Sequence, residues 1–587
     1  MNSVSTDGVR RPETGRGPSR TLVEIFAGTV AEHAGDTALT ADGDSFSYRR
    51  LDDWSRAVGA ELRSHGVRRG DRVALRMPPG AEAVAAILGI LKAGAAYVPL
   101  DVHNPPSRNR FVVGDSGVTA FVGDPDGCLP GDASRSTLRE ADDGTVRGTA
   151  GDVLPDAARP TAPGAAGIPV IGRERVATLR DAPVAAPAGS DRADPPPGPD
   201  DTAYVIYTSG TTGRPKGVPI HHGAVAALLA AAAQRFSFSA ADRWLLFHSV
   251  AFDVSVWEMW GAFSTGGRLV VLPHWTARSP EGCLRVIAEM GISVLNQTPT
   301  AFGSLAAAAL RENADLPSLR YVVFAGEKLL PGKIRPWAER FGLARPTLVN
   351  MYGITETTVH STFHEVTGAD LEGDVSVVGR PLPGFAHRVI TSDGRDAEPG
   401  EQGVLWLAGP QVSRGYLNRP ELDAERFADM PAPGGGPDLR YYRSGDLVSP
   451  TAGGDLVYHG REDLQVKLRG YRIELSDIET AVQSHDLVAD AVVWVREFQP
   501  GDERLVCAYV PAGPTAGTTA GAGTGAEAGT GTAVDARVLR DHVKNLLPSY
   551  MRPAGYRPLP QLPRTVNGKV NRDEVARKWE EGKENGR

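Results

Sequence analysis

The stretch YTSGTTGRPKGV, from Tyr207 to Val218, places three glycines, four aliphatic hydroxyls and two basic side chains in one short segment. Glycines let backbone N–H groups approach an anion closely, hydroxyls donate hydrogen bonds, and a lysine supplies charge. The segment therefore predicts a phosphate-binding loop. It is not the usual loop, G-x-x-x-x-G-K-[ST], because Lys216 follows Gly213 by three residues and Gly217 comes next. Another kind of nucleotide chemistry must explain it.

The segments around this loop predict how it is held. Apolar runs such as DRVALRM, TAYVIYT, RLVVLP, SVLNQTP and RYVVFAG predict buried strands, and GAEAVAAILGILKAG and PEGCLRVIAEMG predict helices between them. Strands that alternate with helices indicate a layered α/β fold with largely parallel sheets, in which ligands bind beyond the carboxyl ends of the strands. The strand TAYVIYT followed by the loop fits that arrangement.

The composition excludes several classes of protein. A formal net charge of −8 argues against a dedicated nucleic-acid binder, because phosphate backbones require basic surfaces. No apolar run is long enough to span a bilayer, and the N-terminus lacks the apolar core of a signal peptide. Cys128, Cys283 and Cys507 show no metal-ligand spacing and are interpreted as reduced thiols of a cytoplasmic protein.

The local composition of the sequence predicts several regions, since 587 residues exceed the length that one hydrophobic core usually stabilises. They are a disordered tail (1–20), a large domain of layered α/β subdomains (21–462), a small α+β domain (463–578) and a second tail (579–587). Two low-complexity insertions, about 124–199 and 512–532, hold too few large apolar residues to offset their ordering entropy. Short structured pieces such as GIPVIG are expected inside the first.

Six motifs occur in one order along the chain: LKAGAAYVPLD, YTSGTTGRPKGV, FDVSVWEMW, NMYGITE, YRSGDL and GREDLQVKLRGYRIEL. NGKVNR follows them at 567–572. Together they resemble the adenylate-forming superfamily of acyl-CoA synthetases, aryl-CoA synthetases and luciferase. Within it they are most similar to the amino-acid-activating adenylation domains of nonribosomal peptide synthesis. The resemblance covers nearly the whole chain from FSYRRLD onward, and it implies a large domain carrying a mobile small lid domain.

The resemblance implies ATP-dependent activation of a carboxylate to an acyl-adenylate, with release of pyrophosphate. The loop would close over the β- and γ-phosphates with Thr208, Ser209, Gly210, Thr211, Thr212, Gly213 and Lys216. In NMYGITE, Tyr352 would lie against adenine, Thr355 near the α-phosphate, and Glu356 on Mg²⁺, which prefers oxygen ligands. The family more often has proline at Ile354, a difference that touches no catalytic atom.

Four further residues acquire roles from the same resemblance. Asp446 of YRSGDL would accept both ribose hydroxyls, and Arg461 of GRED would add a ribose or phosphate contact. Asp463 corresponds to the hinge about which the small domain rotates after adenylation, although an ordinary turn residue would also suit that position. Lys569 of NGKVNR matches the lysine that bridges the substrate carboxylate and the α-phosphate, where a cation offsets the repulsion of two anions.

Asp253 of FDVSVWEMW favours an amino acid over a fatty or aryl acid, because adenylation domains pair an aspartate there with the α-ammonium group. From the stretch alone, an N-capping aspartate is an equal alternative. Motif alignment predicts a side-chain pocket lined by Val254, Trp257, Asn296, Val323, Ala325, Met351, Val359 and His360. The set resembles threonine pockets except at Val254, which more often is phenylalanine there and valine in serine pockets. We expect L-threonine or a related β-hydroxy amino acid, with L-serine as the alternative.

The expected acceptor is the phosphopantetheine thiol of a separate peptidyl carrier protein, because no carrier motif follows Lys569 in the sequence. The resemblance also allows an MbtH-like helper protein on the large domain. Two other functions stay open at this point. One is a CoA-forming acyl ligase of the same superfamily, against which Asp253 counts. The other is a non-catalytic relative that binds ATP and amino acid, against which the presence of Lys216, Glu356, Asp446 and Lys569 counts.

Overall fold

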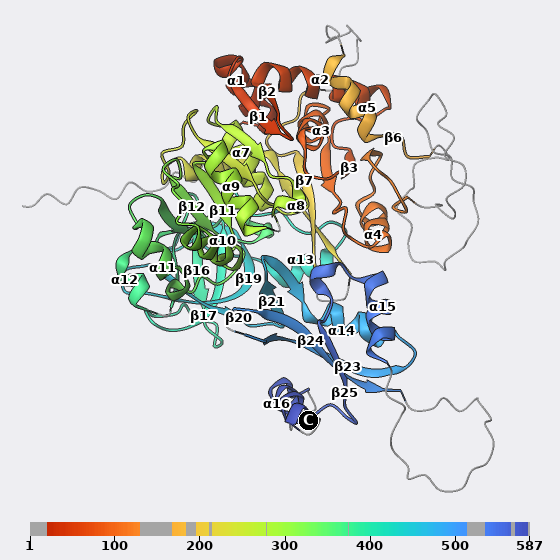
Figure 1. Ribbon diagram of the computed structural model, residues 1–587, viewed down its shortest axis with the longest axis vertical. Coiled ribbons are helices and arrows are strands. Elements are labelled where there is room, and N and C mark those ends of the chain that lie inside the picture. The colour runs from red at the N-terminus through yellow and green to blue at the C-terminus, as the bar shows by residue number, and fades with distance from the viewer. Residues whose placement is uncertain are drawn as a thin grey trace, which may run out of the picture.

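A computed structural model describes residues 20–129, 167–182, 195–210, 214–277, 279–373, 375–499, 501–512, 535–564 and 570–584. Four predicted site residues, Thr211, Thr212, Gly213 and Lys569, lie outside these ranges. So do residues 1–19 and most of both predicted insertions. The described chain forms a large body with a smaller one beneath it (Figure 1), and the predicted α/β fold class is confirmed.

A six-stranded sheet in the order β6-β5-β3-β4-β7-β8 carries the predicted phosphate loop. Its strands are β3 (Arg72–Arg76), β4 (Ala96–Pro99), β5 (Ala120–Gly123), β6 (Val170–Ile171), β7 (Thr202–Thr208) and β8 (Lys216–His221). Neighbours are parallel except β7 and β8, which are antiparallel and are joined by the loop. The predicted strands DRVALRM and TAYVIYT are β3 and β7, and GIPVIG contributes β6.

The helices of this part of the molecule are α2 (Tyr48–Ser64), α3 (Ala81–Lys92), α4 (Pro106–Ser116), α5 (Arg173–Thr178), η1 (Leu179–Asp181) and α6 (His222–Ala232). Of these, α2 and α3 make the most extensive contact with each other. Glycines bring α2 and α3 together, since a Cβ on Gly89 would lie only 2.6 Å from Cβ of Val58. The apolar sequence of α3 is accordingly buried along nearly its whole length.

A 14-stranded sheet forms the rest of the large body, with β18 paired to β19 at the side of the order β16-β17-β19-β20-β15-β14-β13-β12-β11-β9-β10-β1-β2. Strands β1, β10, β9, β11, β12 and β13 are parallel, and the others are antiparallel. The bounds are β1 (Thr37–Ala41), β2 (Asp44–Ser47), β9 (Arg243–Leu246), β10 (Arg268–Val271), β11 (Val294–Gln297), β12 (Tyr321–Phe324), β13 (Thr347–Asn350), β14 (Thr362–Glu365), β15 (Ser376–Pro381), β16 (Ala386–Ile390), β17 (Gly403–Ala408), β18 (Phe427–Pro431), β19 (Asp438–Pro450) and β20 (Leu456–Arg461).

Local sequence signals set the helices of this body. In α9 (Pro280–Met290), the Ser279 hydroxyl caps the first turn, proline occupies the first position, and Gly291 ends the helix at φ 60°. The others are α1 (Leu22–His33), α7 (Val254–Phe263), α8 (His274–Ala277), α10 (Pro299–Arg311), α11 (Pro331–Phe341), η2 (Thr355–Thr357), α12 (Gly368–Glu372) and α13 (Pro420–Arg426).

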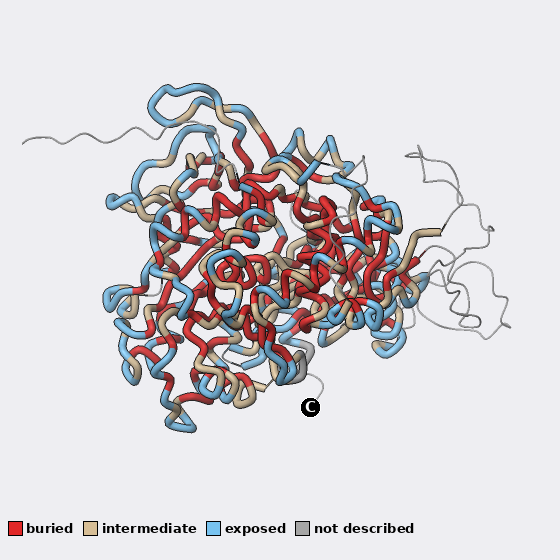
Figure 2. Tube along the Cα trace, turned by 90° about the horizontal axis from the view of Figure 1, so that it is seen from above, coloured by how far each residue is buried: buried red, intermediate tan, exposed pale blue. Residues whose placement is uncertain are grey.

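The small domain begins with a hairpin and has a core of its own. Its elements are β21 (Gln465–Leu468), β22 (Tyr471–Glu474), α14 (Leu475–Gln483), β23 (Val488–Glu497), β24 (Glu503–Pro511), α15 (Ala536–Leu546), η3 (Ser549–Met551), β25 (Gly555–Pro558) and α16 (Arg572–Glu584). Helix α16 continues past residue 578, where the sequence predicts a tail, because Val575 and Trp579 are buried against the β23-β24-β25 sheet. Figure 2 shows buried residues throughout the interior of the molecule and exposed ones at its rim.

Candidate active site

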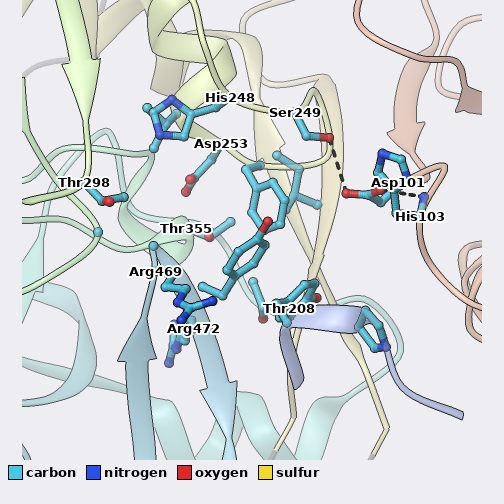
Figure 3. A pocket seen from close by; sticks show the side chains of 18 of the residues that line it. Asp101, His103, Thr208, His248, Ser249, Asp253, Thr298, Thr355, Arg469 and Arg472 are labelled. Carbon is cyan, nitrogen blue, oxygen red and sulfur yellow. Dashed lines mark hydrogen bonds between the residues drawn. The ribbon is translucent and has the colours of Figure 1, made fainter. Parts of the chain in front are cut away.

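A cavity of about 520 Å³ lies where the two bodies meet. Its walls come from the end of β7, the β4–α4 connection, the start of α7, the segment after β13 and the β21–β22 hairpin of the small domain. Figure 3 shows His248 and Asp253 on one wall, Arg469 and Arg472 on the opposite one, and Asp101 and His103 at the side. Elements distant in sequence therefore converge on one chamber.

The phosphate loop enters this chamber at the carboxyl end of β7, as its sequence predicted. Thr208 and Ser209 line the cavity, and Thr208 Oγ1 has no hydrogen-bond partner within the described chain. A Cβ on Gly210 would lie 2.3 Å from the carbonyl oxygen of Arg214, so only glycine fits this turn. Ser209 Oγ donates to the carbonyl of Arg472 at 2.8 Å, which ties the loop to the small domain.

Glu356 is the centre of a buried charge network. Its Oε1 lies 3.2 Å from Lys216 Nζ and accepts from the Tyr416 hydroxyl at 2.7 Å, while Oε2 accepts from Arg472 at 2.8 Å. Burial raises the pKa of Glu356, but the charges of Arg472 and Lys216 outweigh it and hold the pKa well below its usual value. The structure thus brings the predicted Lys216 and Glu356 together as an ion pair.

The three residues predicted to hold the nucleoside also meet. The Tyr352 hydroxyl donates to Asp446 Oδ2 at 2.6 Å, and Arg461 donates to Oδ1 at 3.0 Å. The Asp446 side chain is fully buried. The strand pair β19–β20 sets this geometry, because Asp446 and Arg461 are direct partners across it. A carboxylate fixed in this way can accept hydrogen bonds from a diol, as the ribose role requires.

The predicted hinge residue, Asp463, is clamped in this orientation. Arg461 donates to both of its carboxylate oxygens at 2.7 Å, in the bidentate geometry that guanidinium groups favour. The same arginine therefore contacts both Asp446, the carboxylate predicted to hold the ribose, and Asp463 at the start of the small domain. Rotation of the small domain about residue 463 must therefore either break the Arg461–Asp463 contact or move Arg461 together with Asp463.

Asp253 occupies the N-cap position of α7, yet its side chain makes no capping hydrogen bond. It lines the cavity and interacts with the Thr355 hydroxyl instead. Burial raises the pKa of Asp253, opposed by that hydrogen bond. Within the described chain, Asp253 makes no side-chain capping bond and no ion pair, although the backbone N–H of Val254 also interacts with its carboxylate. The carboxylate thus faces the chamber.

The predicted side-chain pocket is a compact cluster next to Asp253. Val254, Ala325 and Val359 line the cavity, whereas Trp257, Asn296, Val323, Met351 and His360 are buried and lie outside its lining. Trp257 Nε1 donates to Asn296 Oδ1 at 2.8 Å, and the Trp257 and His360 rings meet edge to face at 5.0 Å. Asn296 Nδ2 and both ring nitrogens of His360 have no partner in the described chain.

The small-domain hairpin supplies site residues that the sequence analysis did not assign. Lys467 lies 5.2 Å from the centre of the Tyr352 ring, and burial lowers its pKa. Gly470, at φ 80°, donates its N–H to Glu327 at 2.7 Å, and a Cβ there would lie 2.5 Å from Thr298. The signal was present in KLRGYRIEL, where cations flank a glycine turn. The hairpin reaches the site because of how the small domain is oriented on the large body, and motif spacing does not predict that orientation.

The hairpin also completes an aromatic contact across the domain boundary. Tyr471 and Tyr550 stack with ring centres 3.9 Å apart, and Phe252 of the large body meets Tyr471 edge to face at 5.1 Å. Flanking the undescribed Lys569, Arg564 and Val570 pair with each other by a β-bridge. Val570 packs on the small-domain sheet with Val492. Among described residues, the last to line the chamber is Tyr550.

Comparison with known proteins assigns the chain to a family. Residues 26–417 match the family described as AMP-binding enzyme, and residues 477–569 match the AMP-binding enzyme C-terminal domain. Syringomycin synthase SyrB1 of Pseudomonas syringae pv. syringae is 38% identical over 569 residues, covering 95% of this chain and 82% of that protein. A dimodular nonribosomal peptide synthase of Bacillus subtilis (strain 168) is 39% identical over 560 residues, covering 94% of this chain but 21% of its own length.

Solved structures agree with the sequence relatives. Holo-PA1221, an NRPS protein containing adenylation and PCP domains bound to a vinylsulfonamide inhibitor, superposes with a TM-score of 0.74 at 25% identity. The match covers 95% of this chain and 84% of that one. Within the described residues, no helix is long and apolar enough to cross a membrane. The chain belongs to the AMP-binding enzyme family, as an amino-acid-adenylating ligase of the nonribosomal peptide synthetase type.

Proposed function

We propose that the protein activates L-threonine, or a related β-hydroxy amino acid, and transfers it to the phosphopantetheine thiol of a carrier protein. The substrate assignment rests on the polar atoms of the side-chain pocket that have no hydrogen-bond partner in the described chain. Asn296 Nδ2 and the two nitrogens of His360 are buried among apolar side chains, where each costs free energy unless a ligand satisfies it. A small side chain bearing one hydroxyl would satisfy Asn296 Nδ2 and one of the two His360 nitrogens.

His360 suits a hydroxyl better than a charged group. Burial lowers the pKa of His360 to about 3, so its ring is neutral and offers one donor and one acceptor. A hydroxyl is likewise one donor and an acceptor. Trp257 and Met351 fill the rest of the cluster, which limits the side chain to a small one.

Asp253 supports an amino acid as the acid that is activated. A carboxylate in this chamber is costly without a cation, and the substrate's α-ammonium group would supply one. Lys569 would then bridge the substrate carboxylate and the α-phosphate during adenylation, with Thr355 beside it. Asp446, Arg461 and Tyr352 would hold the nucleoside.

Enzymes of this family use ATP with Mg²⁺, and Glu356 is the carboxylate that fits the metal. The described residues contain no group of three or more acidic, histidine or cysteine side chains able to hold an ion. The metal would therefore be shared between Glu356 and the phosphates. Because Lys216 and Arg472 now occupy both Glu356 oxygens, this site forms only when the hairpin carrying Arg472 withdraws.

The observed orientation suits the second step, transfer to a thiol. The chamber extends from Asp253 to Arg108 and Tyr550 at the boundary between the bodies, a route by which a pantetheine arm would enter. That a PCP domain accompanies adenylation in the similar protein PA1221 supports a carrier as partner. Whether the carrier is a separate chain, and whether an MbtH-like helper is needed, is tested by adding each in trans.

The test is amino-acid-dependent pyrophosphate exchange over a panel of amino acids, with and without a helper protein. We expect threonine to exceed valine, its isostere without the hydroxyl, by about 100-fold or more, because a site built for a hydroxyl leaves polar groups unpaired with the analogue. His360→Leu should reduce that ratio to about 10-fold or less. A wild-type preference for serine would move the assignment to the alternative, and a preference for leucine or phenylalanine would refute the pocket. Coenzyme A outperforming a carrier as acceptor would favour a CoA-forming ligase.

A further inference from the structure

One titratable pair in the chamber has no part in the steps above. His248 lies in the connection between β9 and α7 and lines the cavity, with its side chain 16% exposed. Its Nδ1 lies 2.8 Å from Oε1 of Glu258, whose side chain is fully buried in α7. Figure 3 shows His248 next to Asp253 on the wall that faces Arg469 and Arg472.

The contacts of Glu258 fix the state of the imidazole. Its Oε2 accepts the backbone N–H of His248 at 3.2 Å, and the backbone N–H of Phe247 also donates to the carboxylate. Burial raises the pKa of Glu258, and these donors oppose the shift. A carboxylate supplied with donors accepts a hydrogen bond, so Nδ1 carries the proton and Nε2 is left with its lone pair. No hydrogen bond to Nε2 occurs within the described chain.

We propose that His248 is the general base that deprotonates the acceptor thiol in the transfer step, and that Glu258 is the positioning residue that holds its imidazole in the reactive tautomer. The proposal rests on the function proposed above. The His248 imidazole lines the chamber that also reaches the domain boundary at Arg108 and Tyr550. A thiol that enters there meets it beside Asp253, the expected position of the amino acid.

The step balances without any other reactant. The thiol proton moves to His248 Nε2 while the sulfur bonds to the acyl carbon. The bond between that carbon and the phosphate oxygen breaks, and AMP leaves with the electron pair as an anion that needs no proton. The imidazolium then returns its proton to water. An unperturbed thiol is mostly protonated at neutral pH, so a base within reach accelerates the attack by about 10²–10⁴-fold.

The charged and titratable neighbours of His248 define its pH dependence. They are Glu258 and Asp253 of the α7 region and His360 of the segment after β13. His360 is neutral at the pH of the reaction. Because only an unprotonated base can accept the thiol proton, we expect the transfer rate to rise with pH and then to level off.

The experiment separates the two half-reactions. Enzyme loaded with threonyl-adenylate is mixed with N-acetylcysteamine, or with trifluoroethanethiol, which is far more ionised at neutral pH. Transfer by His248→Gln to N-acetylcysteamine should fall about 100-fold, whereas transfer to trifluoroethanethiol and pyrophosphate exchange should change less than about threefold. Glu258→Gln should lower transfer to N-acetylcysteamine about 10-fold and shift its pH profile. His364→Gln, which alters a second histidine–carboxylate pair 3.0 Å apart outside the chamber, is the matched control.

The outcomes distinguish this inference from the proposed function. Equal losses with both thiols, or a loss of exchange as large as the loss of transfer, would mean that His248 acts through packing or amino-acid binding and would overturn the proposal. An unchanged pH profile in His248→Gln would overturn it as well. Absence of exchange with any amino acid in the wild-type protein would instead refute the proposed function.

Discussion

Asp253 is the side chain on which the proposed amino-acid recognition depends. It faces the chamber from the start of α7 and interacts with the Thr355 hydroxyl. We expect Asp253→Asn to reduce threonine-dependent exchange at least about 100-fold, because the buried α-ammonium group would lose its counter-charge. ATP binding, measured by equilibrium dialysis, should stay within about twofold. Exchange at the wild-type rate would show that the ammonium group binds elsewhere.

Lys569 is predicted to act in adenylation only. Lys569→Ala should lower pyrophosphate exchange at least about 100-fold, since a cation between two reacting anions is lost. Transfer from preformed adenylate to a thiol should be unaffected. Lys578→Ala, at an exposed position on α16, is the matched control and should change neither rate. A Lys569→Ala enzyme that exchanges normally would remove this lysine from the mechanism.

Much of the fold and part of the site followed from sequence. The predicted strands β3, β7, β10, β11 and β12 and helices α3 and α9 are present, because apolar runs bounded by turn residues are local signals. The meeting of Tyr352, Asp446 and Arg461, by contrast, depended on family resemblance. Arg472 and Lys467 were missed because their place beside Glu356 and Tyr352 depends on how two bodies dock.

The contact of α2 with α3 predicts a stability effect. Gly89→Ala would place a methyl group 2.6 Å from Cβ of Val58, so we expect a loss of about 1–3 kcal/mol in the free energy of unfolding. Gly114→Ala in α4 is the control, since nothing lies within 4 Å of its added Cβ. That change should be neutral or stabilising by up to about 1 kcal/mol. Urea denaturation of both variants measures the difference, and equal behaviour would contradict the close packing.

The hairpin strand β22 ends in a buried acid that predicts a pH effect. Burial raises the pKa of Glu474 to about 7, while Gln465 donates to its Oε1. The folded state thus binds a proton that the unfolded chain releases near pH 4.5. Stability is therefore lost as pH rises through about 4.5–7, and the penalty is complete above that range.

Glu474→Gln removes this penalty. The variant should match the wild type at pH 4.5 and be more stable by about 1–3 kcal/mol at pH 8 in urea denaturation. Glu503→Gln, an exposed change on β24, serves as the control. A stability difference that does not grow with pH would contradict protonation of Glu474 in the folded protein.

The proposed function requires the molecule as a whole to change orientation between adenylation and transfer. In the observed one, Ser107 Oγ on α4 donates to the carbonyl of Asn545 on α15 at 3.1 Å. Replacing both residues with cysteine and joining them with a short crosslinker should lower pyrophosphate exchange by more than about 100-fold. Transfer from preformed adenylate should be unchanged. The native Cys128, Cys283 and Cys507 are buried and should not compete. Normal exchange after complete crosslinking would exclude a required rotation.

The contact of Lys216 with Glu356 has a consequence for the direction of the overall reaction. While the hairpin is inserted, Arg472 shares that carboxylate and the lysine expected to grip the leaving phosphates is already engaged. Pyrophosphate and Glu356 would thus compete for one cation, Lys216. Added pyrophosphate should then inhibit loading of the thiol even when the adenylate is preformed. The release of pyrophosphate would make adenylation irreversible, so that the aminoacyl-adenylate is not converted back to ATP and amino acid before transfer.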